Sequence, residues 1–220
     1  MIIDNNQKIN KEILNKYFPD DAINMLVDYI KRLNICLKIT RSRKCKLGDY
    51  RPPPVKGGIH KITINGDLNC YAALLVFLHE LSHLYVWEKY KNNVKPHGKQ
   101  WKEIFGDLVG KFIDMNVFPY VLKKVLEKNK FNFKASFISD SELFRTLTFF
   151  DNDNEKTKTV YLEDIPPKTK FISHNGKIFI KLNKLRKRFR CISLDNQRVY
   201  LFNPLARIKP VAEQLYLDFE

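Results

Sequence analysis

The first 130 residues of the chain carry apolar side chains in a helical rhythm that is interrupted by two short alternating runs. Apolar positions recur every three or four residues in four segments, which predicts four helical regions. These regions are residues 8–33, 69–90, 96–114 and 119–129. Residues 35–40 and 59–65 alternate apolar and polar side chains and predict strands, while the glycines and prolines between them predict a long basic loop. The first half of the chain is therefore expected to fold as an α+β domain with a small sheet.

After residue 140 the pattern changes to short strand-like runs separated by turns. Six such runs are residues 143–150, 159–162, 170–173, 177–182, 189–194 and 199–202. The sequence His174-Asn175-Gly176 predicts a hairpin turn, because Asn-Gly readily adopts positive φ angles. Short strands at this spacing are typical of a small all-β, barrel-like module. We expect two domains, residues 1–135 and residues 140–212, with the boundary between 130 and 142.

Positive charge is the strongest signal in the composition. The 220 residues include 39 Lys and Arg against 24 Asp and Glu, which is a formal net charge of +15 at pH 7. An excess of this size favours a polyanionic partner such as nucleic acid. Residues 165–210 contain twelve of the basic residues and a single acidic one, Asp195. The densest part, which we predict to bind nucleic acid, is Lys181, Lys184, Arg186, Lys187, Arg188 and Arg190.

Aromatic side chains are interleaved with these basic residues, and two roles are open for them. They are Phe171, Phe179, Phe189, Tyr200 and Phe202. On a small barrel they could stack on unpaired bases. Their period-two placement favours the other role, in which they alternate inward as the core of the strands.

The remaining composition argues against several classes of protein. No apolar run reaches the roughly 18 residues that a membrane span needs, and the first residues lack the basic start and apolar run of a signal peptide. The four cysteines form no CxxC pair, as expected of reduced thiols rather than of disulfides or a zinc ribbon. We therefore expect a soluble cytoplasmic protein without a membrane partner.

One short motif carries chemistry, and it lies on the predicted helix 69–90. Two histidines four residues apart project from the same face of a helix, so that His79 and His83 can converge on one metal ion. Glu80 stands beside that ion without occupying it, where it can take a proton from an activated water. The helix is strongly apolar before the motif, and buried polar groups need partners such as a metal. The pattern predicts a zinc site with Glu80 as the catalytic carboxylate.

A catalytic zinc needs three protein ligands and one open position, and two residues are candidates for the third ligand. His97 lies fourteen residues after His83, at the expected start of the next helix. Glu103 is the alternative, because some metallopeptidases use a glutamate from a second helix. The spacing by itself leaves both residues open.

The strand 59–65, the apolar helix leading into the motif, and a second motif together resemble the SprT-like (Spartan-like) family. The second motif is His97-Gly98-Lys99-Gln100-Trp101. The resemblance covers roughly residues 15–115 and implies a zincin-like metallopeptidase domain with His79, His83 and His97 as zinc ligands. It also implies proteolysis associated with DNA. Many members end in a zinc ribbon of paired cysteines, which this chain lacks, since Cys191 stands alone.

Two functions from different classes follow from these observations. The first is a zinc-dependent metallopeptidase that cleaves proteins bound or crosslinked to DNA. The second is a non-enzymatic nucleic-acid-binding protein in which the zinc site is structural. A glutamate directly beside the first ligand is expected for chemistry and is not needed for structure, which favours the peptidase.

Overall fold

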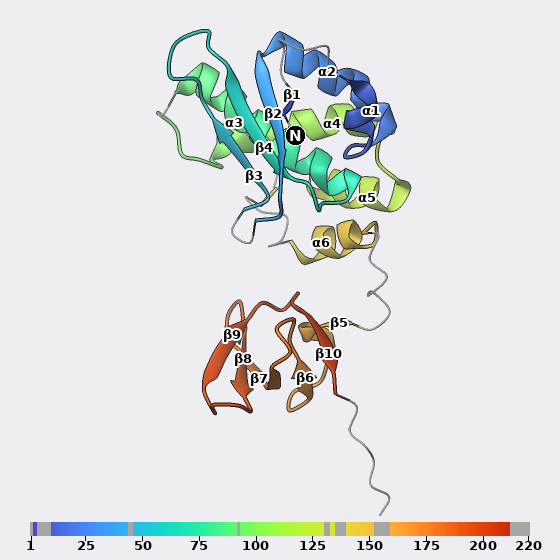
Figure 1. Ribbon diagram of the computed structural model, residues 1–220, viewed down its shortest axis with the longest axis vertical. Helices are drawn as coiled ribbons and strands as arrows, with labels where there is room; N and C mark the ends of the chain where they lie inside the picture. Colours follow the sequence, from blue (N-terminus) through green and yellow to red (C-terminus); the bar gives the residue numbers. More distant parts are fainter. Residues whose placement is uncertain are drawn as a thin grey trace, which may run out of the picture. The chain divides into compact units, whose positions relative to one another are not determined.

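The computed structural model (Figure 1) describes residues 2–3, 10–43, 46–91, 93–129, 133–134, 140–151 and 159–211. The chain divides into two compact units, Met1–Asn152 and Asp153–Glu220, which we call unit 1 and unit 2. Each unit contains its own cluster of buried apolar side chains. We therefore describe each unit by itself.

Unit 1 combines helices with a four-stranded sheet. The strands are β1 (Ile2–Ile3), β2 (Ile35–Thr40), β3 (Gly48–Arg51) and β4 (His60–Asn65). The helices are α1 (Lys11–Asn15), α2 (Ile23–Arg32), α3 (Cys70–Tyr90), α4 (Lys99–Asp114), α5 (Tyr120–Asn129) and α6 (Ser141–Thr148), and the 3-10 turn η1 (Asp20–Ala22) precedes α2. The sheet order is β1-β2-β4-β3, with β2 and β4 parallel and the other neighbours antiparallel. Strand β3 is thus at one edge of the sheet.

Helix α3 is the central element of unit 1. It begins after Asn69, whose side-chain oxygen accepts a hydrogen bond from the N–H of Ala72 and whose amide donates to the carbonyl of Leu147. Among the described residues, α3 is the one helix long and apolar enough to cross a membrane, but 67% of that stretch is buried inside the structure. The sequence prediction of a buried helix is confirmed, because an all-round apolar helix is stable in water only when other elements cover it.

Two segments of unit 1 differ from the sequence prediction. The expected basic loop contains strand β3, which pairs with β4 from Gly48 opposite Ile64 to Arg51 opposite Lys61. Residues 143–150 were expected to form a strand, and this was wrong, because they lie mainly in α6. The Asp140 side chain caps that helix by accepting from the N–H of Leu143.

Unit 2 contains six strands in one sheet. They are β5 (Val160–Tyr161), β6 (Lys170–Ile172), β7 (Ile178–Lys184), β8 (Phe189–Ser193), β9 (Val199–Phe202) and β10 (Arg207–Pro210), with the 3-10 turn η4 (Leu162–Asp164) after β5. The sheet order is β5-β10-β6-β7-β8-β9, and no pairing joins β5 to β9 among the described residues. The strands therefore do not close into a complete barrel among the described residues, and the expected all-β module is a six-stranded sheet with two edges. Helix α6 belongs to unit 1, so that the division of the chain falls after it.

The predicted hairpin and the alternation of core side chains appear in unit 2 as expected. Gly176 adopts a φ angle of +79° in the turn between β6 and β7. Phe171, Phe179 and Phe189 are buried together in the core of this unit, whereas Tyr200 on β9 is 40% exposed. Most of these aromatic side chains therefore stabilise the fold, which is what their period-two placement favours.

Candidate metal centre and active site

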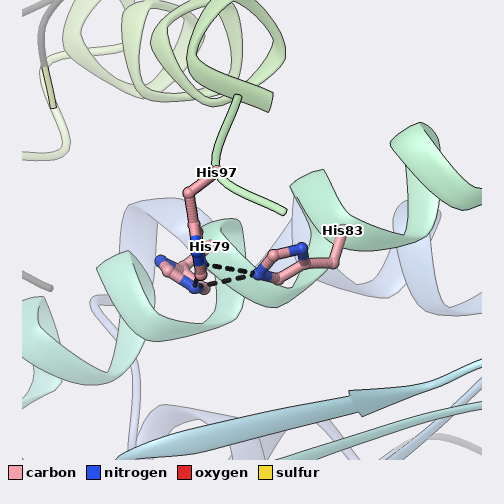
Figure 2. Close-up of side chains that lie close together, drawn as sticks. All are labelled: His79, His83 and His97. Atoms are coloured by element: carbon pink, nitrogen blue, oxygen red, sulfur yellow. Dashed lines mark hydrogen bonds between the residues drawn. The ribbon is translucent and has the colours of Figure 1, made fainter. Parts of the chain in front are cut away.

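Three histidine side chains converge at one point of unit 1 (Figure 2). His79 and His83 project from α3, and His97 reaches them from the segment that precedes α4. Their Nε2 atoms form a nearly equilateral triangle: 3.1 Å from His79 to His83, 3.0 Å from His83 to His97, and 3.1 Å from His97 to His79. No fourth His, Cys, Asp or Glu of the described residues joins this group.

Local backbone geometry explains how the third histidine reaches the other two. His79 and His83 are four residues apart and so lie one turn apart on the same face of α3. His97 has a φ angle of +56°, a left-handed conformation that turns the chain immediately before Gly98, the N-cap of α4. Trp101 on α4 is fully buried and donates its indole N–H to the carbonyl of His79 at 3.4 Å. Its ring centroid lies 4.7 Å from that of His79 and 4.8 Å from that of His97. Trp101 thus anchors α4 against the motif.

The chemistry of the three nitrogens fits a metal ion. Burial lowers the pKa of all three imidazoles. Together with the neighbouring histidines, it brings the pKa to about 3 for His79 and to about 4 for His83. The rings are therefore neutral at pH 7, as metal binding requires. A hydrogen bond between two neutral imidazoles needs one nitrogen that carries a proton and one that does not. Among three nitrogens that face one another, at least one pair is of the same kind and cannot form a hydrogen bond. A cation satisfies all three nitrogens at once, and zinc is among the metals that imidazole ligands suit.

Glu80 lies beside this centre and is almost completely buried, with 7% of its surface exposed. Burial raises the pKa of its carboxyl to about 8, and the charge of Asp49 raises it as well. The backbone N–H of Tyr50 and the charges of Arg43 and Lys46 act in the opposite direction. A divalent cation on the neighbouring histidines would add positive charge here and favour the carboxylate form.

Strand β3 packs directly against Glu80, a relationship that the sequence did not reveal. A Cβ atom on Gly48 would lie 2.5 Å from Oε1 of Glu80 and 2.6 Å from Cγ1 of Val76, so only glycine fits at this close approach. Two residues further along β3, the backbone N–H of Tyr50 lowers the pKa of the Glu80 carboxyl. The edge strand therefore fixes the position of the acid.

A cavity of about 510 Å³ opens beside the histidines. Its walls include Glu80, His79 and His83 from α3, together with Gly48 and Tyr50 from β3. It continues along α3 past His83 to a second group of residues, Val86, Trp87, Lys91, Val94 and Pro96. The candidate metal centre is thus accessible, and one wall of its approach is a strand edge.

The structure distinguishes the two candidates for the third ligand. Glu103 lies on α4 with its side chain 58% exposed and 3.8 Å from the ammonium of Lys99. It is not part of the three-residue group, whereas His97 is. Tyr85, on α3, is also separate from the centre: it lines another depression and accepts a hydrogen bond from Arg32 at 3.4 Å.

The six basic residues predicted to bind nucleic acid are not equivalent in the structure. Lys184, Arg186, Lys187, Arg188 and Arg190 are exposed along and beside the turn between β7 and β8, and we call them the hairpin cations. Lys181 is only 3% exposed. Its ammonium donates to the carbonyl of Ile165 at 2.5 Å and to that of Glu163 at 3.3 Å, and lies 4.1 Å from the centroid of the Phe189 ring. Lys181 therefore supports the core of unit 2 and is not accessible to a phosphate.

The fold and the site together define a group of three histidines that could hold a metal ion, with a buried glutamate beside them; two of the histidines and the glutamate are on the long central helix of an α+β domain. The model of the SprT-like family matches residues 6–117, half of the chain, and the chain belongs to this family. The matched range contains all three histidines, Glu80 and strands β2 to β4. Membership supports a metallopeptidase-like function. Comparisons with curated proteins and with solved structures gave no match.

Proposed function

We propose that the protein is a zinc-dependent, zincin-like endopeptidase that cleaves proteins bound or crosslinked to DNA. The observation that carries the catalytic part is the triangle of Nε2 atoms, 3.0–3.1 Å apart, with buried Glu80 in the same cavity wall. Three protein ligands with no fourth among the described residues leave a position open for water or substrate. A structural zinc site would be closed by a fourth ligand.

The residues of the chain divide the catalytic work between them. A zinc ion held by His79, His83 and His97 would supply a Lewis acid that polarises the scissile carbonyl and makes water more acidic. Glu80 accepts the proton of the attacking water and returns it to the leaving amine. Strand β3 orients the Glu80 carboxylate for both transfers, because Gly48 lies directly against one carboxylate oxygen.

Strand β3 supplies a way to hold an extended peptide across the centre. Within the part of the chain that the structure describes, it pairs with β4 along one side only and is the last strand in the sheet order. Its residues Gly48, Asp49 and Tyr50 line the cavity next to the histidines. A peptide that adds to this edge would gain backbone hydrogen bonds that do not depend on its sequence.

The nucleic-acid part of the proposal depends on the hairpin cations of unit 2. Five exposed positive charges within seven residues repel one another unless an anion approaches them. Phosphates neutralise such charges with release of counterions, so the binding would weaken steeply with salt. In the cytoplasm, binding of DNA by the hairpin cations would bring the peptidase to proteins that are on the DNA.

The variant Glu80→Gln tests the mechanism, and Glu103→Gln is its matched control. Both remove one carboxylate from neighbouring helices, but only Glu80 is buried beside the histidines. We expect Glu80→Gln to retain stoichiometric zinc and to lose cleavage of a DNA-bound protein by about 10²–10⁴-fold. Glu103→Gln should retain both zinc and cleavage. Undiminished cleavage by Glu80→Gln would contradict the mechanism.

A wild-type protein that holds zinc and binds DNA but cleaves no protein would support the non-enzymatic alternative.

A further inference from the structure

The far end of the cavity, beyond His83, has a different chemical character from the metal centre. Its walls are largely apolar or aromatic, and we call this end the Trp87 recess. It is formed by Tyr50, Pro52, Val86, Trp87, Val94 and Pro96. Trp87 lies four residues after His83 and therefore one helical turn further along the same face of α3. The recess is thus continuous with the metal centre.

Interactions on its outer side hold the aromatic walls of the recess in place. The hydroxyl of Tyr50 is 3.0 Å from Nδ1 of His60, and the two rings are stacked with their centroids 5.9 Å apart. The His60 ring packs edge-on against Trp87, at 5.7 Å between centroids, and its Nε2 lies 3.4 Å from Glu88. Since these contacts already engage the Tyr50 hydroxyl, the two aromatic rings offer mainly their carbon surface to an occupant.

Lys91, which follows the last residue of α3, is the one charged side chain among the described residues of the far wall of the cavity. It has a φ angle of +52°, and its ammonium lies 3.6 Å from the centroid of the Trp87 ring. The same ammonium is 4.0 Å from a carboxylate oxygen of Glu88. The Lys91 ammonium therefore already contacts the Glu88 carboxylate and the Trp87 ring. We do not expect it to bind an acidic side chain of a substrate.

We propose that the Trp87 recess is a specificity subsite that takes an apolar side chain of the peptide substrate next to the scissile bond, an inference that rests on the proposed peptidase function. Tyr50 carries the link between the two sites. Its ring forms a wall of the recess, and Gly48, two residues before it on the same strand, lies against the Glu80 carboxylate. A peptide lying along β3 with its carbonyl at the histidines therefore brings a neighbouring side chain to the recess. Leucine or phenylalanine buries enough apolar surface there for a preference of about 10- to 100-fold over glycine.

Binding of short peptidyl hydroxamates to the zinc-loaded protein tests this inference without requiring turnover. The compounds differ only in the side chain that reaches the recess: glycine, leucine, phenylalanine or aspartate. We expect calorimetry to show leucine and phenylalanine binding about 10- to 100-fold more tightly than glycine, with aspartate no better than glycine. Equal affinity across the series, or a preference for aspartate, would overturn the inference.

Two variants separate a subsite from a general structural effect. Val94→Phe narrows the recess, so the phenylalanine compound should lose its advantage while the glycine compound binds as before. Trp87→Ala should remove the preference for both apolar compounds. The control is Tyr85→Phe, which changes a residue of α3 that lines a different depression, and should leave the series unchanged. An unchanged preference in folded Val94→Phe would contradict the proposal.

The same compounds keep the two proposals distinguishable. If the binding series keeps its side-chain preference but the protein cleaves no substrate, the subsite is supported and the peptidase function is contradicted. If the protein cleaves substrates without any side-chain preference, the peptidase function is supported and the subsite is contradicted. If the protein proves to hold no zinc, the corresponding peptide amides test the recess through the NMR shift of the Trp87 indole. No shift that depends on the side chain would then overturn the inference.

Discussion

Units 1 and 2 use polar side chains in opposite ways. In unit 1 the reactive groups are buried or half-buried, and helix geometry determines where they point, so that His79, His83 and Glu80 reach one site from five consecutive positions. In unit 2 the basic groups are mostly exposed at a hairpin, and their proximity in sequence says little about their environment. Lys181 is buried and engaged by two carbonyl oxygens, whereas Lys184, at the end of the same strand, is exposed. The comparison shows that residue spacing predicts which side chains meet where the backbone is a regular helix, whereas charge density does not predict the environment of a single residue.

The largest expected effect breaks the metal centre itself. His97→Ala removes one of three converging nitrogens, and we expect zinc affinity to fall by more than the roughly 100-fold that loss of an outer-shell partner costs. Glu103→Ala, a change on the adjacent helix, should leave zinc content unchanged. Metal analysis after dialysis against a weak chelator measures both. Loss of zinc from Glu103→Ala, with zinc retained by His97→Ala, would reverse the ligand assignment.

A smaller effect is expected where β3 meets the acid. Gly48→Ala places a methyl group 2.5 Å from Oε1 of Glu80, so the carboxylate must move away from its position. We expect peptide cleavage to fall by about 10²-fold, since small misplacements of catalytic groups have effects of that size. Zinc content should stay at one equivalent, because the three histidines do not contact Gly48. Gly176→Ala, in the unit 2 hairpin, is a control of the same chemistry that should retain cleavage.

Substitution of one buried and one exposed lysine of unit 2 tests whether the two residues have different roles. Lys181→Met removes an ammonium that satisfies two buried carbonyl groups, and we expect a loss of about 1–3 kcal/mol in the free energy of unfolding. Lys184→Met should change that free energy by no more than about 0.5 kcal/mol. It should instead reduce the slope of the logarithm of DNA affinity against the logarithm of salt concentration by about one, as the loss of one phosphate contact does. Chemical denaturation and salt titrations measure the two properties separately, and equal effects on stability would contradict the distinction.

The last prediction concerns Cys191, a buried neighbour of Lys181 on the paired strand. Burial raises the pKa of this thiol to about 11, so the folded protein keeps it protonated up to higher pH than an unfolded chain does. A group of this kind adds stability below the unfolded pKa near 9, and that stability is lost as the pH rises towards 11. At pH 8 we expect alkylation about 100-fold slower than in denaturant, measured by peptide mass spectrometry. Equal rates would show that the core of unit 2 is open.

The helices of unit 1 could be predicted from sequence more reliably than its other elements. Helix α3 has an N-cap residue, Asn69, next to it in the sequence. Its long run of apolar residues is stable in water only when other elements cover the helix. Strand β3 could not be predicted, since Gly48 and Tyr50 become a strand only by pairing with β4 and packing against Glu80. His97 could be identified only by a second motif in the sequence, because its left-handed backbone returns it to α3 from a non-helical segment.

Unit 2 was harder to predict because its strands pair over long distances. Strand β10 inserts between β5 and β6 and leaves the sheet open, and neither feature has a local signal. Residues 143–150 illustrate a competing local signal. Leu143 and Leu147 share a helical face, and Asp140 supplies the cap, but the aromatic pair after them is equally typical of a strand.

The sequence by itself determined the two histidines and the glutamate of the motif, because a helix of 3.6 residues per turn places positions 79 and 83 on one face wherever that helix lies. It also determined an excess of positive charge near the C-terminal end. The tertiary structure decided which residue completes the triangle, which strand orients Glu80, and which lysine faces the core. These depend on contacts between segments far apart in the chain, and such contacts are set by packing and burial rather than by local spacing.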